Sequence, residues 1–458
     1  MEKHADDRVT GGTVNGTGSF KMRADRIGHD TVLAQIVELV GKAQQSKAPL
    51  QRLADRIASF FVPTVVAIAL LTFVVWLFVG PEPRLAYAIV NAVAVLIIAC
   101  PCALGLATPI SITVASGRGA AAGVLFRDAA AIEGLAHINV LVLDKTGTLT
   151  EGRPALTDVV ATVGFAESDV LMIAASLEAA SEHPLAQAIL DAAKSRNVAH
   201  SEVSNFSSVT GQGVLGDIGA VNVALGNAEL MQSVGVDPAS LAQRADELRR
   251  DAKTVMFLAR GRQLAGLVAV QDPIKPGARA ILIALRDEKL RIVMLTGDSE
   301  ATAHAVASQL GIDEYHASQT PAKKSEWIVG TKTAGACVAM AGDGVNDAPA
   351  LTVADVGIAM GNGSDIAKQS AQITLIKGEL AGILRALRLS KATVRNIHQN
   401  LAFAFLYNAL GIPIAAGVLY PFFGWLLSPM IAALAMSLSS VSVITNALRL
   451  RTVRKISM

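Results

Sequence analysis

The chain has 458 residues, enough for two to four domains, and 52% of them are hydrophobic whereas only 17% are charged. This composition is too apolar for an ordinary soluble enzyme and too charged for a protein that lies wholly inside a membrane. The net charge of +2, without a long basic run, argues against nucleic acid as a partner. Three cysteines do not suggest a secreted disulfide scaffold and favour metal or redox chemistry in a reducing compartment.

The first 45 residues are polar and rich in Gly and Thr, and they contain no signal peptide. Alternating apolar positions predict the end of a small β domain, which leads into a helix near Asp30. This segment is too short to be a domain by itself.

Four apolar stretches are long enough to cross a bilayer. They span residues 58–80, 86–112, 399–419 and 424–447. Basic residues flank the outer ends of each pair, and the turns within the pairs contain one arginine, Arg84. By the positive-inside rule, we expect a multi-pass protein of the plasma (inner) membrane, with both termini and the soluble domains in the cytoplasm.

The second stretch contains Cys100-Pro101-Cys102 in otherwise apolar sequence, with Pro109 behind it. Proline removes a helical hydrogen bond and kinks the segment, which turns both sulfurs inward. Polar groups at membrane depth mark transport paths, and thiolates select soft ions such as Cu(I). Cys100 and Cys102 are therefore candidate ligands of a transported ion. The alternative is two thiols buried as small hydrophobes.

An apolar run over residues 138–143 predicts a buried strand, and Asp144-Lys145-Thr146-Gly147-Thr148-Leu149-Thr150 follows it. The carboxylate therefore lies at the carboxyl end of a strand, where open α/β sheets place their chemistry. An aspartate there can attack phosphorus and become an aspartyl phosphate. Lys145 would put positive charge beside Asp144, and the Thr and Gly groups offer donors for phosphate oxygens.

The pattern changes between Glu151 and about Val270. An amphipathic helix near 168–196 precedes short strands and Gly turns, which predicts an α+β insertion with its own nucleotide site. Three more strands, separated by helices, then indicate a parallel α/β sheet. They span residues 291–295, 337–340 and 356–360.

Acidic side chains follow these strands at Asp298, Asp343 and Asp347, with Asn346 between the last two. Parallel strands bring their carboxyl ends to one edge, so we expect these groups to meet Asp144 there. Mg²⁺ prefers hard oxygen ligands, which makes Asp144, Asp343 and a phosphate oxygen a plausible cage. Lys324 would balance the charge of the transferring phosphoryl group. The alternative is a set of loop acids that cap helices.

The last two apolar stretches decide the ion, because residues 399–448 contain no Asp, Glu, Lys or Arg. A divalent ion such as Zn²⁺ usually requires a carboxylate there, whereas a monovalent soft ion does not. The stretches carry polar, sulfur-containing and helix-bending side chains instead. These are Asn400, Tyr407, Asn408, Pro413, Met436, Ser439 and Ser440. Taken singly, Tyr407 or Met436 would more often be a packing residue.

The heptad from Asp144 to Thr150 is the phosphorylation motif of P-type ATPases, and the chain resembles that family from Met1 to about Lys455. The resemblance implies a haloacid-dehalogenase-like phosphorylation domain with an inserted α+β nucleotide-binding domain and four transmembrane helices. Its catalytic residues would be Asp144, Lys145, Thr146, Thr296, Gly297, Asp298 and Lys324. Its Mg²⁺ ligands would come from Asp144, Thr146, Asp343 and Asp347. The domains would be 1–45 (remnant of an actuator domain), 46–112 and 386–458 (membrane), 113–151 and 269–385 (phosphorylation) and 152–268 (nucleotide).

Ser181-Glu182-His183-Pro184-Leu185 resembles the His-Pro motif of the heavy-metal branch of that family. The resemblance implies that ATP binds at Glu178, His183, Gly211, Gly213, Gly226 and Asn227. Imidazole can stack on adenine, and Gly allows close backbone approach. The Asn-six-residues-Tyr-Asn and Met-x-x-Ser-Ser patterns resemble the copper-exporting subgroup. They imply that Tyr407, Asn408, Met436 and Ser440 bind Cu(I) or Ag(I) together with Cys100 and Cys102.

Full-length members of the family begin with metal-binding modules and further membrane helices, and carry a Thr-Gly-Glu loop that directs water onto the aspartyl phosphate. This chain has no Thr-Gly-Glu, and residues 1–9 resemble the stretch just after that loop. We expect an N-terminally truncated pump whose phosphoenzyme persists, with a metallochaperone or a second chain as a further partner. A membrane-anchored phosphatase and a non-pumping metal-binding remnant remain alternatives.

Overall fold

The computed structural model describes residues 22–23, 41, 49–100, 102–181, 185–209, 211–343, 345–361 and 364–452. The predicted β remnant over residues 1–45 falls almost wholly outside this description. The chain divides into two compact units. The helical unit comprises residues 1–138, 371–377 and 382–458, and the sheet unit comprises residues 139–370 and 378–381.

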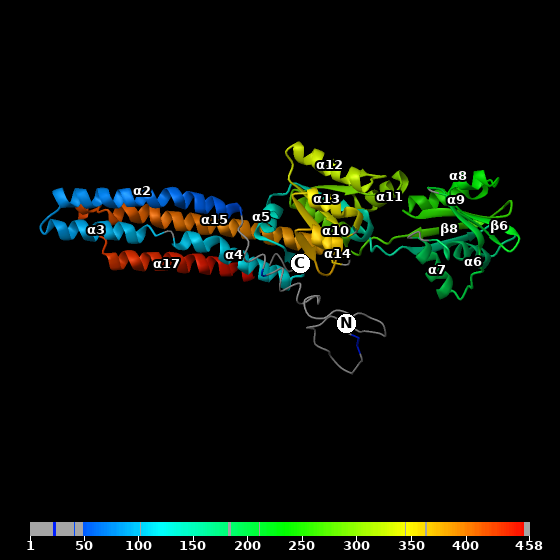
Figure 1. Cartoon of the computed structure of the whole chain (residues 1–458), viewed down its shortest axis with the longest axis horizontal. Helices are drawn as coiled ribbons and strands as arrows, with labels where there is room; N and C mark the ends of the chain where they lie inside the picture. The colour runs from blue at the N-terminus through cyan, green and yellow to red at the C-terminus, as the bar shows by residue number, and fades with distance from the viewer. Residues whose placement is uncertain are drawn as a thin grey trace. The chain divides into compact units, whose positions relative to one another are not determined.

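Long helices dominate the helical unit (Figure 1). They are α2 (Pro49–Val79), α3 (Arg84–Ile98), α4 (Cys102–Ala121), α15 (Ala381–Ala415) and α17 (Pro429–Leu448). Shorter elements are α5 (Ala129–His137), α16 (Tyr420–Phe423) and the 3₁₀ turn η4 (Arg449–Thr452). Strand β1 (Val124–Phe126) pairs antiparallel with β13 (Ile373–Leu375).

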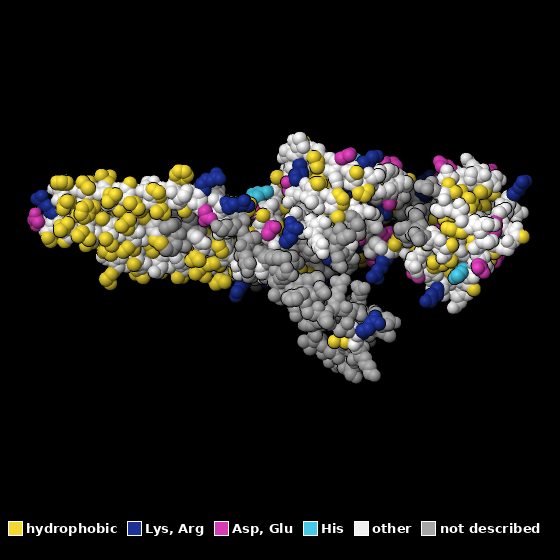
Figure 2. All heavy atoms as spheres, in the orientation of Figure 1, with side chains coloured by type: hydrophobic (Ala, Val, Ile, Leu, Met, Phe, Trp, Pro, Cys, Tyr) yellow, Lys and Arg dark blue, Asp and Glu magenta, His cyan; other side chains and the backbone are white. Residues whose placement is uncertain are grey.

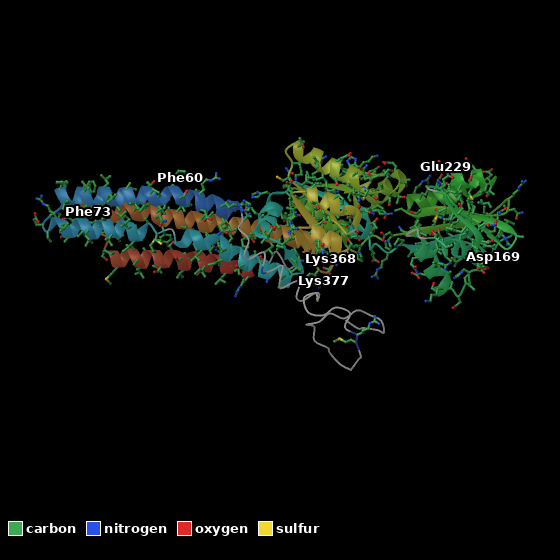
Figure 3. All side chains as sticks on the ribbon, viewed as in Figure 1. Phe60, Phe73, Asp169, Glu229, Lys368 and Lys377 are labelled. Carbon is green, nitrogen blue, oxygen red and sulfur yellow. The ribbon has the colours of Figure 1, made fainter. Side chains whose placement is uncertain are left out.

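Two helices in the described part of the chain, α2 and α17 with its following turn, are long and apolar enough to cross a membrane. Helix α3 is apolar but shorter. Of the predicted stretch 399–419, residues 399–415 form the second half of α15, which ends at Ala415. Hydrophobic side chains cover the visible face of the helical unit, and Phe60 on α2 is 73% exposed (Figures 2 and 3). A helix that exposes apolar side chains in this way is suited to lipid.

The predicted stretch 86–112 is two helices and not one kinked segment. Helix α3 ends at Ile98, and α4 begins at Cys102. The backbone N–H of Cys100 turns back to the carbonyl of Ile97 at 3.2 Å, which closes α3 with a tight turn. Pro101 has no N–H to continue the ladder, so the helix must restart after it.

Five parallel strands form the central layer of the sheet unit, in the order β12-β11-β2-β9-β10. They span Val356–Met360, Val338–Gly342, Val140–Asp144, Arg291–Leu295 and Glu314–His316. Helix α10 (Ala278–Asp287) precedes β9. The helices that follow β9, β10, β11 and β12 are α11 (Glu300–Leu310), α12 (Pro321–Thr333), α13 (Ala348–Val353) and α14 (Asp365–Ser370). Strand β2 is central and wholly buried, and Val142 and Met340 belong to its core. Of these five strands, four were predicted from the sequence, and the short β10 was not.

The predicted insertion is an antiparallel sheet in the order β3-β8-β7-β6-β5-β4. The strands span Ala155–Ala161, Gln263–Gln271, Thr254–Arg260, Val221–Gly226, Gly213–Ile218 and Ser204–Val209. Its helices are α6 (Glu167–Glu178), α7 (Ala186–Ser195), α8 (Ala228–Ser233) and α9 (Ala239–Arg250). The single helix predicted near 168–196 is therefore two helices, because a proline in the sequence between them disfavours continuation.

Candidate active site

The loop after β2 is shaped by a glycine. Gly147 has φ 68°, and a Cβ placed on it would lie 1.5 Å from Asp343 Oδ2. No other residue could take this conformation without displacing the carboxylate. The chain therefore leaves Asp144 in a tight turn, η2 (Lys145–Leu149), and brings Asp343 directly against it.

Asp144 ends β2 and is 5% exposed. Lys324 on α12 places its Nζ 2.5 Å from Asp144 Oδ1 and 2.7 Å from Asp347 Oδ1, and is itself 6% exposed. Thr320 caps the start of α12 by accepting a hydrogen bond from the N–H of Lys323, which fixes the turn that carries Lys324. One buried ammonium thus bridges two buried carboxylates.

The carboxylates of this site are crowded. Burial, and then the charge of Asp347, raise the pKa of Asp144 to about 7, although Lys324 opposes the shift. Burial and Asp347 likewise raise the pKa of Asp343 to about 6. Burial alone would lower the pKa of Lys324, but its bonds and charge interactions with Asp144 and Asp347 outweigh burial and raise it. The three carboxylates therefore outnumber the one ammonium, that of Lys324, which contacts two of them.

Oxygen atoms of Asp144, Asp343 and Asp347 lie within 4.8 Å of one another. Three carboxylates at this spacing form a hard-oxygen donor set, and the raised pKa values of Asp144 and Asp343 are the expected result of burying carboxylates side by side. The residues therefore fit a Mg²⁺ ion. Thr146, the fourth predicted ligand, is exposed at the rim of the same turn.

Lys145 does not contact Asp144 as the sequence suggested. Its side chain is buried and its Nζ pairs with Asp298 Oδ2. The positive charge beside Asp144 comes from Lys324, because consecutive residues of a turn point in different directions. Thr296 is buried and its Oγ1 accepts a hydrogen bond from the N–H of Asp298 at 3.1 Å, while Gly297 between them is exposed. Asn346, beside Asp347, is also exposed.

Asp272 holds the far side of the loop, and sequence reasoning missed it. Its Oδ1 accepts hydrogen bonds from the N–H groups of Gly152 and Arg153, at 2.9 and 3.2 Å. Thr150 Oγ1 lies 2.5 Å from Asp272 Oδ2. Asp272 directly follows the apolar strand β8, and this is the same signal that singled out Asp144.

Lys275 was missed as well. Its Nζ donates to the carbonyls of Gly147 and Gly378, the latter at 2.9 Å. Burial lowers the pKa of Lys275, and the nearby charges of Asp343 and Asp272 act in the opposite direction. Asp272 and Lys275 therefore hold the loop after β2 at two points, near Gly152 and at Gly147.

Four of the predicted nucleotide-binding residues come together at one end of β5 and β6. Gly213 faces Gly226 across the two strands. Gly213 has φ 147°, and a Cβ there would lie 2.2 Å from the carbonyl oxygen of Leu225, so the backbones approach too closely for a side chain. Asn227 caps α8 and its Nδ2 donates to the carbonyl of Gly211 at 3.2 Å.

Of the remaining two nucleotide candidates, the structure describes Glu178 but not His183. Glu178 is buried at the end of α6, which packs against β5 and β6. His183 lies outside the described residues.

Two of the candidate ion ligands lie in the interior of the helical unit. Met436 belongs to the core cluster that Cys100 packs against, and Asn408 is 5% exposed. Asn408 Oδ1 has no hydrogen-bond partner in the part of the chain that is described. The side chain of Cys102 lies outside that part.

The other two candidates are less enclosed. Tyr407 is 40% exposed. Ser440 Oγ donates to the carbonyl of Met436, in its own helix, at 3.3 Å.

A parallel sheet with a buried aspartate at the end of its central strand, facing a lysine and further carboxylates, is the arrangement of a haloacid-dehalogenase-like domain. Residues 138–355 match the family model described as haloacid dehalogenase-like hydrolase, and residues 331–387 match a second model of that description.

A copper-transporting P-type ATPase of Rhizobium leguminosarum bv. viciae is 58% identical over 451 residues, which cover 98% of this chain and 54% of the relative. A silver exporting P-type ATPase of Salmonella typhimurium is 51% identical, over 99% of this chain and 55% of the relative. The crystal structure of a zinc-transporting PIB-type ATPase in its E2.Pi state has a TM-score of 0.74 and 32% identity, and covers 92% of this chain and 68% of that one. The chain belongs to the P-type ATPases. It spans about half the length of the curated relatives.

Proposed function

We propose that this chain provides the phosphorylation, nucleotide-binding and carboxyl-terminal membrane parts of an ATP-driven exporter of Cu(I) or Ag(I). One observation carries the proposal: Asp144 is buried at the end of the central strand, bridged through Lys324 to Asp347. A buried carboxylate held by a lysine at the edge of a parallel sheet is suited to form a covalent phosphoenzyme.

The phosphoryl transfer follows from the positions of these groups. An oxygen of Asp144 attacks the γ-phosphorus of ATP, the bond from that phosphorus to the bridging oxygen breaks, and ADP leaves with the electron pair. Lys324 keeps its charge beside the attacking oxygen and offsets the negative charge of the incoming phosphoryl group. The Lys145–Asp298 ion pair holds a second ammonium at the same strand edge.

Asp144, Asp343 and Asp347 would hold Mg²⁺, with Thr146 as a further candidate. When bound, Mg²⁺ neutralises charge on the phosphoryl oxygens. Lys275 and Asp272 hold the loop so that Asp343 stays against Gly147. ATP would bind along the paired ends of β5 and β6, where Gly213 and Gly226 leave the backbone open to a flat ligand. Glu178, Gly211, Asn227 and His183 would complete that site.

The choice of ion rests on charge. Residues 399–448 contain no acidic or basic side chain, so a bound divalent ion would be unbalanced in the membrane. The relatives that share 58% and 51% identity are named for copper and silver, whereas the zinc-transporting structure shares 32%. Cys100, Cys102, Asn408 and Met436 would hold the ion, with Tyr407 and Ser440 at the margin.

The same proposal implies a location and partners for the chain. The apolar helices α2 and α17 support a multi-pass protein of the plasma (inner) membrane with cytoplasmic soluble domains and termini. A metallochaperone, or a second chain, is a further partner.

Labelling with γ-phosphate-labelled ATP and Mg²⁺ tests the proposal. The full chain should form an acid-stable, hydroxylamine-labile phosphoprotein, and Asp144→Asn should form none. Asp313→Asn, which changes a side chain that is 95% exposed, is the matched control and should label normally. Equal labelling of Asp144→Asn would refute the assignment of the nucleophile.

A further inference from the structure

Four polar side chains join three helices of the helical unit through one group of hydrogen bonds. We name it the Asn–Ser layer, and its members are Ser111 on α4, Asn396 and Asn400 on α15, and Asn446 on α17. None of them is more than 7% exposed. None belongs to the candidate ion ligands.

The bonds of the layer cross between helices. Ser111 Oγ lies 2.9 Å from Asn396 Oδ1, and Asn400 Nδ2 donates to Ser111 Oγ at 3.2 Å. Asn446 Nδ2 donates to Asn400 Oδ1 at 2.9 Å, and Asn396 Nδ2 donates to the backbone carbonyl of Asn446 at 2.9 Å. The side-chain amides of Asn396 and Asn400 each donate and accept, whereas Asn446 donates through its side chain and accepts through its backbone carbonyl. Helices α4 and α17 are therefore each bonded to α15.

The layer lies at a similar distance from a candidate ion ligand along each of the three helices. Ser111 is nine residues after Cys102, Asn400 is eight before Asn408, and Asn446 is ten after Met436. At 1.5 Å per residue, these separations are roughly 12–15 Å. Helix α4 runs from Cys102 to Ala121 as one element, so the spacing applies along it as well. Fixing the layer therefore fixes the height of three ligand positions at once.

The two sets of amides differ in how they are bonded. Both ends of the Asn400 side chain are paired, whereas Asn408 Oδ1, on the same helix, has no partner among the described residues. A buried amide oxygen without a donor is available to a ligand, and a fully paired amide is not. The paired amides of the layer are suited to hold helices together, whereas the oxygen of Asn408 is suited to accept a ligand.

We propose that Ser111, Asn396, Asn400 and Asn446 are positioning residues for the transported ion, an inference that rests on the proposed function. Apolar helix contacts tolerate small rotations, but paired amides do not. A one-residue slip would leave several buried donors and acceptors unpaired, which disfavours the slipped arrangement. Apart from the two cysteines, the candidate ligands are neutral and provide no ion pairs that could orient the helices around a monovalent ion. The layer provides that orientation instead.

The test measures metal affinity and coordination in the purified full chain, with Cu(I) as the probe. Ser111→Ala and Asn446→Leu should weaken Cu(I) binding by about tenfold or more in competition with a chelator, as loss of supporting hydrogen bonds does at other metal sites. Both should also change the Cu X-ray absorption spectrum. Ser111→Thr keeps the hydroxyl and should restore both properties.

Thr393→Val is the matched control. Thr393 is buried on α15, and among the described residues its hydroxyl donates to the carbonyl of Leu389 in its own helix, at 2.7 Å, and to no other helix. Its substitution should leave affinity and spectrum unchanged. Ser111→Ala is the smallest change and decides the matter even where Asn446→Leu fails to fold.

The outcomes separate the two proposals. Unchanged affinity and spectrum in Ser111→Ala, with normal binding by the unsubstituted chain, would overturn the positioning role and leave the proposed function standing. A chain that binds neither Cu(I) nor Ag(I) would overturn the proposed function, and the positioning role with it.

Discussion

The candidate active site of the sheet unit and the candidate ion path of the helical unit treat charge in opposite ways. At the end of β2, three carboxylates and a lysine share one buried site, and burial raises the pKa of Asp144 to about 7. The candidate ion path contains two cysteines, a thioether, hydroxyls and amides, and its last two apolar stretches contain no Asp, Glu, Lys or Arg. Charge is concentrated where ligands bring the opposite charge with them, and it is omitted where lipid would leave it uncompensated.

Removal of Lys324 should break the charged site with the largest effect. Lys324→Met leaves Asp144 and Asp347 buried without their shared cation, which should cost about 3–5 kcal/mol of unfolding free energy. Phosphorylation of Asp144 should fall by roughly 100-fold, as expected when a preorganised charge is lost. Urea unfolding and initial labelling rates measure the two effects.

The neighbouring lysine supplies the control for this experiment. Lys323→Met changes an exposed side chain on the same helix, and both quantities should stay near those of the unsubstituted chain. A labelling rate in Lys324→Met that equals the rate in Lys323→Met would show that the buried ion bridge has no part in phosphorylation.

A carboxylate placed in the neutral path should sharpen the comparison. Asn408→Asp introduces the charge that a divalent ion requires, so the ratio of Zn²⁺ to Cu(I) affinity should rise by about tenfold or more. Asn408→Leu removes the amide oxygen without adding charge and should weaken Cu(I) binding without a gain for Zn²⁺. Competition titrations with matched chelators measure both ratios, and an unchanged ratio in Asn408→Asp would contradict selection by neutrality.

Much of the candidate active site could be predicted from the sequence, because the pattern that marks each acidic residue is local in the chain. Asp144, Asp298 and Asp343 each follow an apolar strand, and parallel strands must bring such ends together. The partners of the lysines could not be predicted in this way. Lys324 reaches Asp144 across 180 residues of sequence, and Lys145 points from its turn toward Asp298 rather than toward its own neighbour.

The helical unit was predicted less completely, for a different reason. Hydropathy identifies apolar stretches, but it does not give the rotation of one helix against another. The sequence therefore singled out Asn400 without its partners Ser111 and Asn446. It also predicted a kink at Pro101, whereas the extent of the break depends on the local bond from Cys100 to Ile97.

The pH dependence of Mg²⁺ binding should report the crowding of the carboxylates. Asp144 and Asp343, with pKa values of about 7 and about 6, must lose their protons before they bind the cation. Protons and Mg²⁺ compete, so affinity should rise with pH from about 5 and level off above about 7–8. In Asp343→Asn, the part of the rise near pH 6 should disappear. Isothermal titration at several pH values measures this, and a flat profile would mean that neither carboxyl binds the ion.

The smallest loss of unfolding free energy is expected at a solvent-exposed ion pair of the sheet unit. Arg291 holds Glu314 through two hydrogen bonds of 2.7 Å, a geometry as good as that of Lys324, but the two side chains are 55% and 30% exposed. The bond to Arg291 lowers the pKa of Glu314, yet solvent screens most of that interaction. Arg291→Ala should therefore lower the free energy of unfolding by only about 0–1 kcal/mol, and the loss should shrink in high salt. Urea unfolding at low and high salt measures it. A loss of unfolding free energy as large as that of Lys324→Met would show that ion-pair geometry, rather than burial, sets the energy of these charges. The contrast between the buried site and its exposed surroundings would then not hold.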